Sequence, residues 1–393
     1  MQRIKERLLG GEALVAGVLS GTSGDGIDVA ITRFATASEA TLGPPELIAF
    51  ETFPFPEALR ERVRRVLDGE PTGLRASALL SRDLGRAFGS AARRLALQRA
   101  LQLDLVASHG QTVWHHDGVG SDGAATLQLG DGDFVAEESG AAVVSDFRQR
   151  DIAAGGEGAP LSALADPLVF ADVPRPCAIL NLGGMANLTI LRENGEVAGF
   201  DSGPANSLLD GLARKFLGRD FDDQGAFAAR GKVSERLVRE LLAHPFLKRA
   251  PPKSTGRDTF GTAWIETVVA RARDLDVLQS DTAPEDLLAS AADFVARSAI
   301  HALEAFDGNV QWLVLCGGGV HHAPLVEALA VRSRAPVASS ADFGVDPDAR
   351  EALVFAVLGA SFVLGIPLTR PSVTGARVGR ILGKYSPGVS AGG

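Results

Sequence analysis

Residues 13–34 have the sequence ALVAGVLSGTSGDGIDVAITRF, and this stretch decides the fold. Its beginning, residues 13–19, is an apolar run of strand length, and residues 27–34 alternate in part between apolar and polar side chains, as a half-buried strand does. Between the two runs lies a turn with three glycines and several hydroxyl side chains. The pattern predicts a β-hairpin whose tip is rich in glycine and hydroxyl groups.

The tip of this hairpin, from Gly21 to Gly26, has the composition of a phosphate-binding turn. Backbone N–H groups of a tight, glycine-containing turn form a concavity that binds phosphate oxygens, and Thr22 and Ser23 add hydroxyl donors. Asp25 could orient a metal-bound water. The alternative is an ordinary hairpin turn, for which one glycine suffices. The pattern GxxxxGK[ST] is absent from the chain, which excludes a Walker A loop.

The second half of the chain begins in the same way. An apolar run (177–182), a turn and a return run (188–191) precede a third run (196–200), which we expect to end at Asp201. In both halves helical spacing follows the meander, and a buried strand then ends in a turn. The halves are offset by roughly 165 residues, which is too long for a solenoid repeat and predicts a duplicated α/β domain.

The composition is that of a soluble globular protein with two or three domains. The chain has 393 residues, of which 46% are hydrophobic and 22% are charged. Its net charge of −9 argues against a nucleic-acid partner. No run approaches the ~18 apolar residues of a membrane helix, and no signal peptide is evident. The two cysteines fit no metal spacing, so we predict a cytoplasmic protein without a membrane partner, and a homodimer stays open.

Two glycine clusters and one carboxylate follow predicted strands. Gly183 and Gly184 form the tip of the second hairpin and, by internal symmetry, predict a second phosphate-binding turn. The triple glycine at 317–319 would let an adenosine lie flat against the backbone, the alternative being a flexible loop. Asp201 could accept a proton from an attacking hydroxyl or water, or it could simply cap its turn.

The segment 145–156 mixes charged residues with a glycine pair. Its Arg148, Arg150 and Asp151 could recognise a substrate that carries a carboxylate and hydroxyls, since the guanidinium fork suits carboxylates. The alternative is an exposed cluster of ion pairs. A GxGxxG match at 118–123 lacks the preceding strand and the following helix, which excludes a Rossmann site. The histidine pairs at 115–116 and 321–322 lack further ligands at metal spacing.

Taken in order, these motifs resemble the anhydro-N-acetylmuramic acid kinases, a family of bacterial cell-wall recycling enzymes. The similarity extends from Val15 to about Gly375. The motifs that show the similarity are SGTSGDGID (20–28), SHGQT (108–112), DFRQRDIAAGGEGAP (146–160), NLGG (181–184), FDSGPAN (200–206), PKSTGR (252–257) and CGGG (316–319).

The resemblance implies an α/β fold of two duplicated ribonuclease-H-like lobes with an interlobe cleft, the actin-like ATPase fold of the sugar kinase, Hsp70 and actin superfamily. We predict an N-terminal lobe over residues 13–170, a C-terminal lobe over residues 171–375 and a tail over residues 376–393.

The resemblance also implies an ATP-dependent kinase that uses Mg²⁺. Such an enzyme opens anhydro-N-acetylmuramic acid by hydrolysis and phosphorylates O6, which gives N-acetylmuramic acid 6-phosphate and ADP in peptidoglycan recycling. Its catalytic base would be Asp201, with Asp25 beside the metal. The sugar contacts would be His109, Gln111, Thr112, Arg150, Asp151 and Glu351. Motifs and resemblance together predict ATP contacts at Gly21, Thr22, Ser23, Gly24, Asp25, Gly26, Ile27, Asp28, Gly183, Gly184, Gly317, Gly318 and Gly319.

Two positions depart from the family pattern, and two other functions remain open. Gly24 stands where the family usually has a bulkier apolar residue, and His322 stands where it commonly has a polar amide. One alternative is a sugar kinase that acts on an ordinary hydroxyl. The other is an actin- or Hsp70-like ATPase switch. An Hsp70-like function is disfavoured, because this chain lacks a further peptide-binding domain. The cluster at Arg150 and Asp151 favours a small acidic sugar as the substrate.

Overall fold

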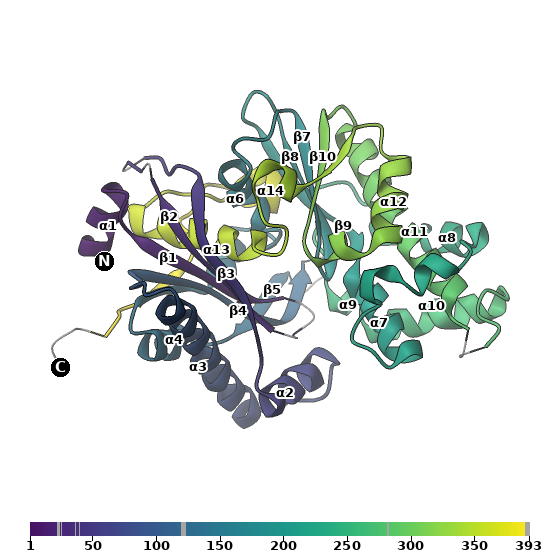
Figure 1. Ribbon diagram of the computed structural model, residues 1–393, viewed down its shortest axis with the longest axis horizontal. Coiled ribbons are helices and arrows are strands. Elements are labelled where there is room, and N and C mark those ends of the chain that lie inside the picture. The colour runs from purple at the N-terminus through teal and green to yellow at the C-terminus, as the bar shows by residue number, and fades with distance from the viewer. Residues whose placement is uncertain are drawn as a thin grey trace. The chain divides into compact units, whose positions relative to one another are not determined.

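The computed structural model describes residues 1–21, 24, 26–35, 37–38, 40–118, 123–280 and 283–389. The chain divides into two compact units (Figure 1). Unit 1 comprises Met1–Ala171 together with Ala349–Gly393, and unit 2 comprises Asp172–Asp348. The predicted lobe of residues 171–375 therefore included a segment, from residue 349 onward, that belongs to unit 1. The helix that this segment forms packs on the sheet of unit 1. The order of predicted elements along the sequence does not reveal this packing.

The sheet of unit 1 is built around the hairpin that opens the sequence. Its strands are β1 (Leu14–Ser20), β2 (Gly26–Phe34), β3 (Pro45–Pro54), β4 (Leu105–Asp117), β5 (Ala124–Leu129), β6 (Ala142–Ser145) and β12 (Lys384–Ser386). β1, β2 and β3 form an antiparallel meander, β4 lies parallel to β1, and β6 lies parallel to β4, in the order β12-β6-β4-β1-β2-β3. β12 comes from the predicted tail, so part of that tail is a strand of this sheet.

Unit 2 repeats this topology. Its strands are β7 (Cys177–Leu182), β8 (Met185–Leu191), β9 (Val197–Pro204), β10 (Trp312–Cys316) and β11 (Val337–Ser339). β7, β8 and β9 form the antiparallel meander, and β10 and β11 extend the sheet in parallel on the other side of β7. Both units therefore have the ribonuclease-H-like strand arrangement, and the predicted duplicated α/β fold is confirmed. The expected strand end at Asp201 is wrong, because β9 continues to Pro204.

Helices cover both faces of the unit 1 sheet. They are α1 (Gln2–Leu9), α2 (Glu57–Leu67), α3 (Leu74–Gln98), α4 (Gly132–Ser139), α5 (Phe147–Ala153), α6 (Ser162–Val169), α13 (Arg350–Leu364) and α14 (Pro371–Thr374). Apolar side chains of α3 and α4 pack on one face with those of β1 and β2. On the other face α13 approaches β1 so closely that a Cβ on Gly17 would lie 1.8 Å from the Ala352 carbonyl oxygen. This contact explains the glycine within an otherwise apolar strand.

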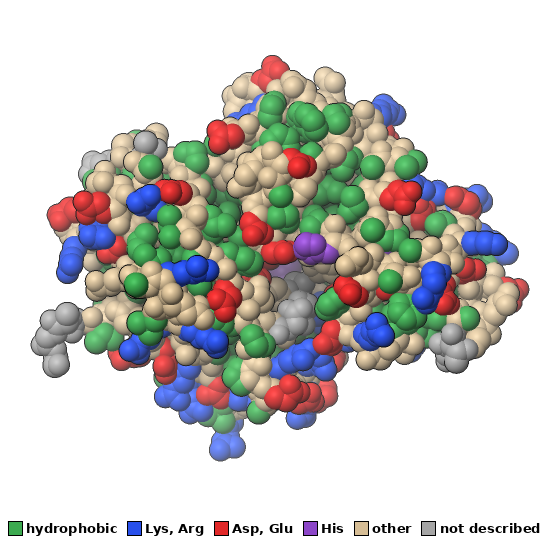
Figure 2. Space-filling model, viewed as in Figure 1, with side chains coloured by type: hydrophobic (Ala, Val, Ile, Leu, Met, Phe, Trp, Pro, Cys, Tyr) green, Lys and Arg blue, Asp and Glu red, His purple; other side chains and the backbone are tan. Residues whose placement is uncertain are grey.

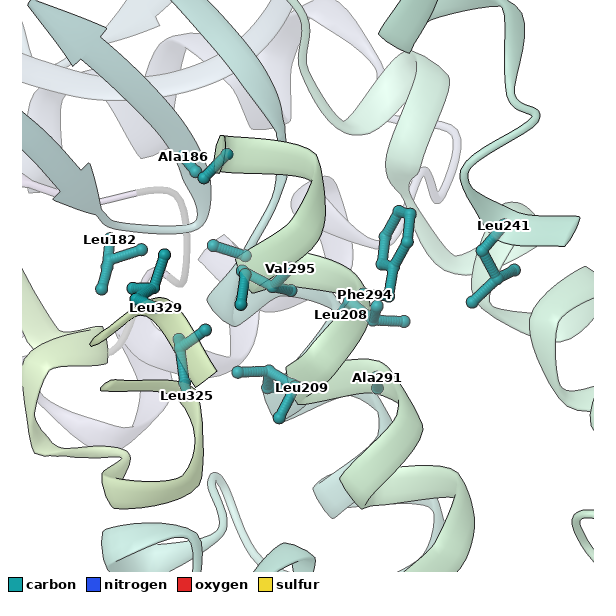
Figure 3. Packing of buried hydrophobic residues seen from close by; sticks show 14 of the residues in the cluster. Leu182, Ala186, Leu208, Leu209, Leu241, Ala291, Phe294, Val295, Leu325 and Leu329 are labelled. Carbon is teal, nitrogen blue, oxygen red and sulfur yellow. The ribbon is translucent and has the colours of Figure 1, made fainter. Parts of the chain in front are cut away.

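Unit 2 has its own apolar core. Its helices are α7 (Asn206–Leu217), α8 (Glu235–Leu241), α9 (Arg257–Phe260), α10 (Thr262–Asp274), α11 (Glu285–Asp307) and α12 (Ala323–Arg332), with the 3₁₀ turns η1 (Asp223–Gly225), η2 (Ala228–Arg230), η3 (Pro245–Lys248), η4 (Gly318–His321) and η5 (Ser340–Phe343). Figure 3 shows Leu208 and Leu209 of α7 beside Phe294 and Val295 of α11. This packing holds the helices on the sheet that carries Asp201.

The surface has mixed charge. On the face shown in Figure 2, Lys and Arg side chains lie among Asp and Glu side chains. Cys177 and Cys316 are both buried and free. None of the helices in the described ranges is both long and apolar enough to cross a membrane.

Candidate functional site

The predicted site residues belong to both units. Unit 1 carries the glycine-rich turn and the residues predicted to bind sugar, and unit 2 carries Asp201 and the other two glycine clusters. Thr22, Ser23 and Asp25 lie outside the described residues.

The glycine-rich turn of unit 1 is anchored by Gln111. The Nε2 of Gln111, on β4, donates a hydrogen bond to the Gly21 carbonyl oxygen at 3.0 Å, and the Gly24 N–H donates to the same oxygen at 3.2 Å. Gly24 has φ +66°, and a Cβ there would lie 2.6 Å from Leu67 Cδ1. The positive φ favours glycine at this position, and a larger residue would also have to displace the Leu67 side chain. Gly26 and Ile27 are buried at the start of β2, and Asp28 accepts a hydrogen bond from Thr52.

Three unsatisfied polar atoms lie near the point where the parallel pairing of β1 and β4 ends. Ser20 Oγ, Ser108 Oγ and Gln111 Oε1 are buried and have no hydrogen-bond partner among the described residues. Ser20 lies opposite Gln111 in the parallel pair of β1 and β4. Leaving such an atom unpaired costs about 1–3 kcal/mol, so these three polar atoms suit a ligand or an ordered water. Ser20 is the last residue of β1, and the carboxyl end of a parallel strand is where ligands bind in open α/β sheets.

The imidazole of His109 is neutral, with one ring nitrogen donating a hydrogen bond and the other accepting one. Its Nε2 accepts a hydrogen bond from Arg148 Nε at 2.9 Å, so its Nδ1 carries the proton and donates to the Gly110 carbonyl oxygen at 3.1 Å. Its ring lies 4.5 Å from that of Phe355 on α13. Burial and the neighbouring Arg148 charge lower the pKa of His109 well below 6.5. His109 therefore stays uncharged at neutral pH.

We expect this histidine to make the protein less stable in acid. In the unfolded chain it binds a proton below pH 6.5, whereas in the folded chain it does not, so stability falls as the pH decreases below 6.5. The limiting slope is about 1.4 kcal/mol per pH unit for each such group. His115 adds a second contribution, because burial lowers its pKa to about 4. Urea unfolding between pH 7.5 and 5 should show this loss, and His109→Asn should show a shallower slope.

The other predicted sugar residues lie on three elements of unit 1. Thr112, on β4, accepts a hydrogen bond from Gln128. Arg150, on α5, is exposed and forms no ion pair within the part of the chain that the structure describes. Asp151 is fully buried and accepts hydrogen bonds from the Gly158 N–H at 2.8 Å and the Thr374 hydroxyl at 2.7 Å. Glu351 is half-buried on α13, one turn before Phe355 and on the same helix face.

In unit 2 the structure brings the two glycine clusters together. Gly317 has φ +81°, and Cβ atoms on Gly317 and Gly319 would each lie about 3 Å from the Leu182 carbonyl oxygen, next to Gly183. The carbonyl oxygens of Gly183 and Gly184 accept N–H groups at the start of α7. His322 caps α12, with its Nδ1 accepting the Leu325 N–H at 3.3 Å, so this departure from the family pattern has a structural use.

Asp201 is fixed on the central part of β9. Its side chain is 4% exposed, its Oδ2 accepts the Thr255 N–H at 2.8 Å, and its own N–H donates to the Lys253 carbonyl oxygen at 3.0 Å. Residues 253–255 therefore hold both the backbone and the carboxylate of Asp201. The sequence motifs contained Lys253 and Thr255, but nothing in their spacing indicated that they contact Asp201.

Lys253 is a buried ammonium beside this carboxylate. It is 2% exposed, and its Nζ donates to the carbonyl oxygens of Phe246 and Leu247, both at 3.4 Å. Burial lowers the pKa of Lys253 to about 8, the charge of Asp201 acts to raise it, and Arg249 lowers it further. A cation held at this position favours an ionised Asp201.

We expect Lys253→Met to change how stability depends on alkaline pH. Between pH 8 and 10.5 the unfolded wild-type chain keeps the proton that the folded chain has lost, so wild-type stability rises with pH over this range. The rise should approach about 1.4 kcal/mol per pH unit. Urea unfolding from pH 7 to 9.5 should show it in the wild type, and Lys253→Met should lack it. Equal slopes in both proteins would contradict the assignment.

The described residues contain no dedicated metal cage. Among them, no three His, Cys, Asp or Glu side chains gather closely enough to hold a metal ion. Mg²⁺ in kinases is usually held by one or two carboxylates together with substrate phosphates and waters.

Comparison with known proteins gives relatives that match nearly the whole chain. The family model described as anhydro-N-acetylmuramic acid kinase matches residues 13–388. A protein of that name from Xanthomonas oryzae pv. oryzae is 40% identical over 379 residues, covering 95% of this chain and 97% of the relative. Another from Pseudomonas fluorescens is 37% identical, covering 95% and 99%.

Solved structures give more distant likenesses. The activator of 2-hydroxyisocaproyl-CoA dehydratase from Clostridium difficile with bound ADPNP aligns with 89% of this chain and 96% of its own, at 14% identity and a TM-score of 0.43. A ROK family glucokinase from Streptomyces griseus aligns with 88% of this chain and 98% of its own, at 13% identity and a TM-score of 0.37. The classification rests instead on the whole-chain family match: this chain belongs to the anhydro-N-acetylmuramic acid kinase family.

Proposed function

We propose that this protein is a cytoplasmic, ATP-dependent kinase that opens anhydro-N-acetylmuramic acid with water and phosphorylates the released O6. The products are N-acetylmuramic acid 6-phosphate and ADP, in peptidoglycan recycling. The observation that carries the proposal is Asp201, a buried carboxylate of which one oxygen is held by the Thr255 N–H. In a chain of this family, such a carboxylate has the features of a general base.

Asp201 would activate the attacking water. One oxygen of the carboxylate is fixed, which orients the group so that its remaining lone pairs can accept a proton. As the water proton moves to Asp201, the water oxygen bonds to the anomeric carbon, and the bond between that carbon and O6 breaks. Lys253 would favour the ionised form of Asp201 that this step needs.

The nucleotide contacts would come from the three glycine clusters. When bound, MgATP supplies the γ-phosphoryl group that the released O6 accepts. We propose that the turn at 21–28 binds phosphate oxygens through its backbone N–H groups, with Gly183 and Gly184 contributing in the same way. The carbonyl of Gly21, held by Gln111, would fix the shape of the turn. Gly317, Gly318 and Gly319 would lie against the adenosine.

The sugar contacts would come from β4, α5 and α13 of unit 1. The exposed guanidinium of Arg150 would pair with the substrate carboxylate, because a charged bidentate contact is among the strongest hydrogen bonds that a side chain makes. Gln111 Oε1 and the hydroxyls of Ser20 and Ser108 are buried acceptors without protein partners among the described residues. They suit a ligand or ordered water that donates hydrogen bonds at this end of the sheet.

A substrate panel tests the proposal against its alternatives. The purified protein is incubated with MgATP alone, with anhydro-N-acetylmuramic acid, or with the ring-opened sugar, and ADP and sugar phosphate are measured. We expect both products with the anhydro sugar. Phosphorylation of only the ring-opened sugar would indicate a kinase for an ordinary hydroxyl. ADP release that no sugar accelerates would indicate an ATPase switch.

A further inference from the structure

The last part of the chain returns to α5, the helix that carries Arg150, the proposed sugar-binding arginine. We call residues 371–386 the C-terminal strap. The Thr374 hydroxyl donates to Asp151 Oδ1 at 2.7 Å, and the Thr374 carbonyl oxygen accepts the Glu157 N–H at 2.8 Å. The Arg377 N–H donates to the Ala154 carbonyl oxygen at 3.1 Å. The strap therefore binds the C-terminal end of α5 and the loop that follows it.

The strap also binds the other end of α5. Its strand β12 pairs with β6, the strand that leads into α5. Lys384 forms an ion pair with Asp146, the residue that precedes α5 and has φ +55°. Both ends of the helix are thus connected to one segment that lies more than 200 residues further along the chain.

The helix α5 depends on such contacts. It has seven residues, and its N-cap side chain makes no capping hydrogen bond. Isolated helices of this length are unstable in water, so tertiary contacts must fix its position. On it, Arg148 holds His109 and the Gly158 carbonyl oxygen, while Arg150 is exposed. A shift of α5 would displace both arginines together.

Asp151 connects the strap to this helix. Its carboxylate is fully buried, and its two oxygens accept hydrogen bonds from Thr374 and Gly158. Burial raises the pKa of this carboxyl group, whereas the two hydrogen bonds act to lower it. Loss of one donor would leave a buried charge with half of its support, and the loop at 154–158 would rearrange.

We propose that the C-terminal strap positions α5 for sugar binding, with Thr374 and Asp151 as positioning residues that do not touch the sugar. This inference rests on the proposed function. It assigns a use to a segment that the sequence analysis divided between the C-terminal lobe (to residue 375) and the tail (from residue 376). It also changes the expected role of Asp151 from a sugar contact to a support for the helix that carries Arg150.

The matched variants Thr374→Val and Thr374→Ser test this proposal. Valine keeps the shape of the side chain but removes the hydroxyl, whereas serine keeps the hydroxyl. Loss of one buried hydrogen bond should raise KM for the sugar about tenfold in Thr374→Val, with KM for ATP changed less than about twofold. Thr374→Ser should restore KM for the sugar to near the wild-type value. A general loss of folding would instead lower the active fraction and leave both KM values unchanged.

Two further variants keep the test decisive. If Thr374→Val does not fold, Lys384→Met at the exposed end of the strap should still raise KM for the sugar, by about threefold. The double variant Thr374→Val, Asp151→Asn should be no worse than the more impaired single variant, because both act through one contact.

Three results would contradict the proposed role of the strap. They are an unchanged KM for the sugar, an equal rise in the KM values for sugar and ATP, or a KM for the sugar in the double variant that equals the product of the two single effects. A wild-type protein inactive on the anhydro sugar would instead overturn the proposed function, and the strap with it.

Discussion

Asp201→Asn should lower kcat by about a thousandfold while changing nucleotide affinity by less than about twofold. An amide cannot accept the proton of the attacking water. It can still accept the Thr255 N–H, so the geometry around residue 201 should persist. Steady-state kinetics measure kcat, and isothermal titration with ATP measures affinity without turnover of sugar.

A surface carboxylate of the same unit provides the control. Asp274 is exposed and pairs with Arg271 at the end of α10, so Asp274→Asn should leave kcat within about twofold of the wild type. Undiminished turnover by Asp201→Asn would remove Asp201 as the base. Loss of both turnover and nucleotide binding would indicate that residue 201 supports the fold of unit 2 and not the chemistry.

Arg350→Met should destabilise unit 1 by about 3–5 kcal/mol. Arg350 and Asp166 are both fully buried, and the Arg350 Nε donates to Asp166 Oδ1 at 3.0 Å. Removal of the guanidinium takes away the group that pairs with both oxygens of the fully buried Asp166 carboxylate. Hydrogen exchange, analysed separately for the amides of unit 1, measures the free energy of opening. Because Glu351 is the next residue, loss of this pair should also raise KM for the sugar.

The charge pair can be tested further by removing both partners. The double variant Arg350→Met, Asp166→Leu should regain most of the lost stability, since an apolar pair can replace a buried ion pair of similar volume. If Arg350→Met lowered the free energy of unfolding by less than about 1 kcal/mol, the Arg350–Asp166 pair would contribute no more than a surface salt bridge. That result would contradict the expectation that this buried pair stabilises unit 1.

The sequence was sufficient to predict the two strand meanders and their duplication. The apolar run at 13–19 and its counterpart at 177–182 became β1 and β7, each at the centre of the same arrangement. Apolar residues keep helical spacing over residues 74–103, but α3 ends at Gln98, and Ala100 just beyond it adopts φ +53°. Helix ends depend on such local backbone choices, which side-chain periodicity does not report.

Contacts between segments that are distant along the chain could not be predicted from the sequence. The return of α13 and β12 to unit 1 depends on packing, such as that of Gly17 against Ala352, and not on any local signal. Residue types indicated Asp201 and Arg150 as chemically useful. They could not show that Thr255 holds Asp201 or that Thr374 holds Asp151, because each of these contacts joins segments at least 50 residues apart.

Heavy-oxygen labelling tests the central claim most directly. The protein, MgATP and anhydro-N-acetylmuramic acid are mixed in oxygen-18 water, quenched early, and the sugar phosphate is analysed by mass spectrometry with fragmentation. A sample of unlabelled product, held in the same water for the same time, corrects for exchange at the anomeric carbon. We predict one heavy oxygen on the anomeric carbon and none on the phosphate. Product without heavy oxygen at that carbon would contradict the account of Asp201 as the base that activates water.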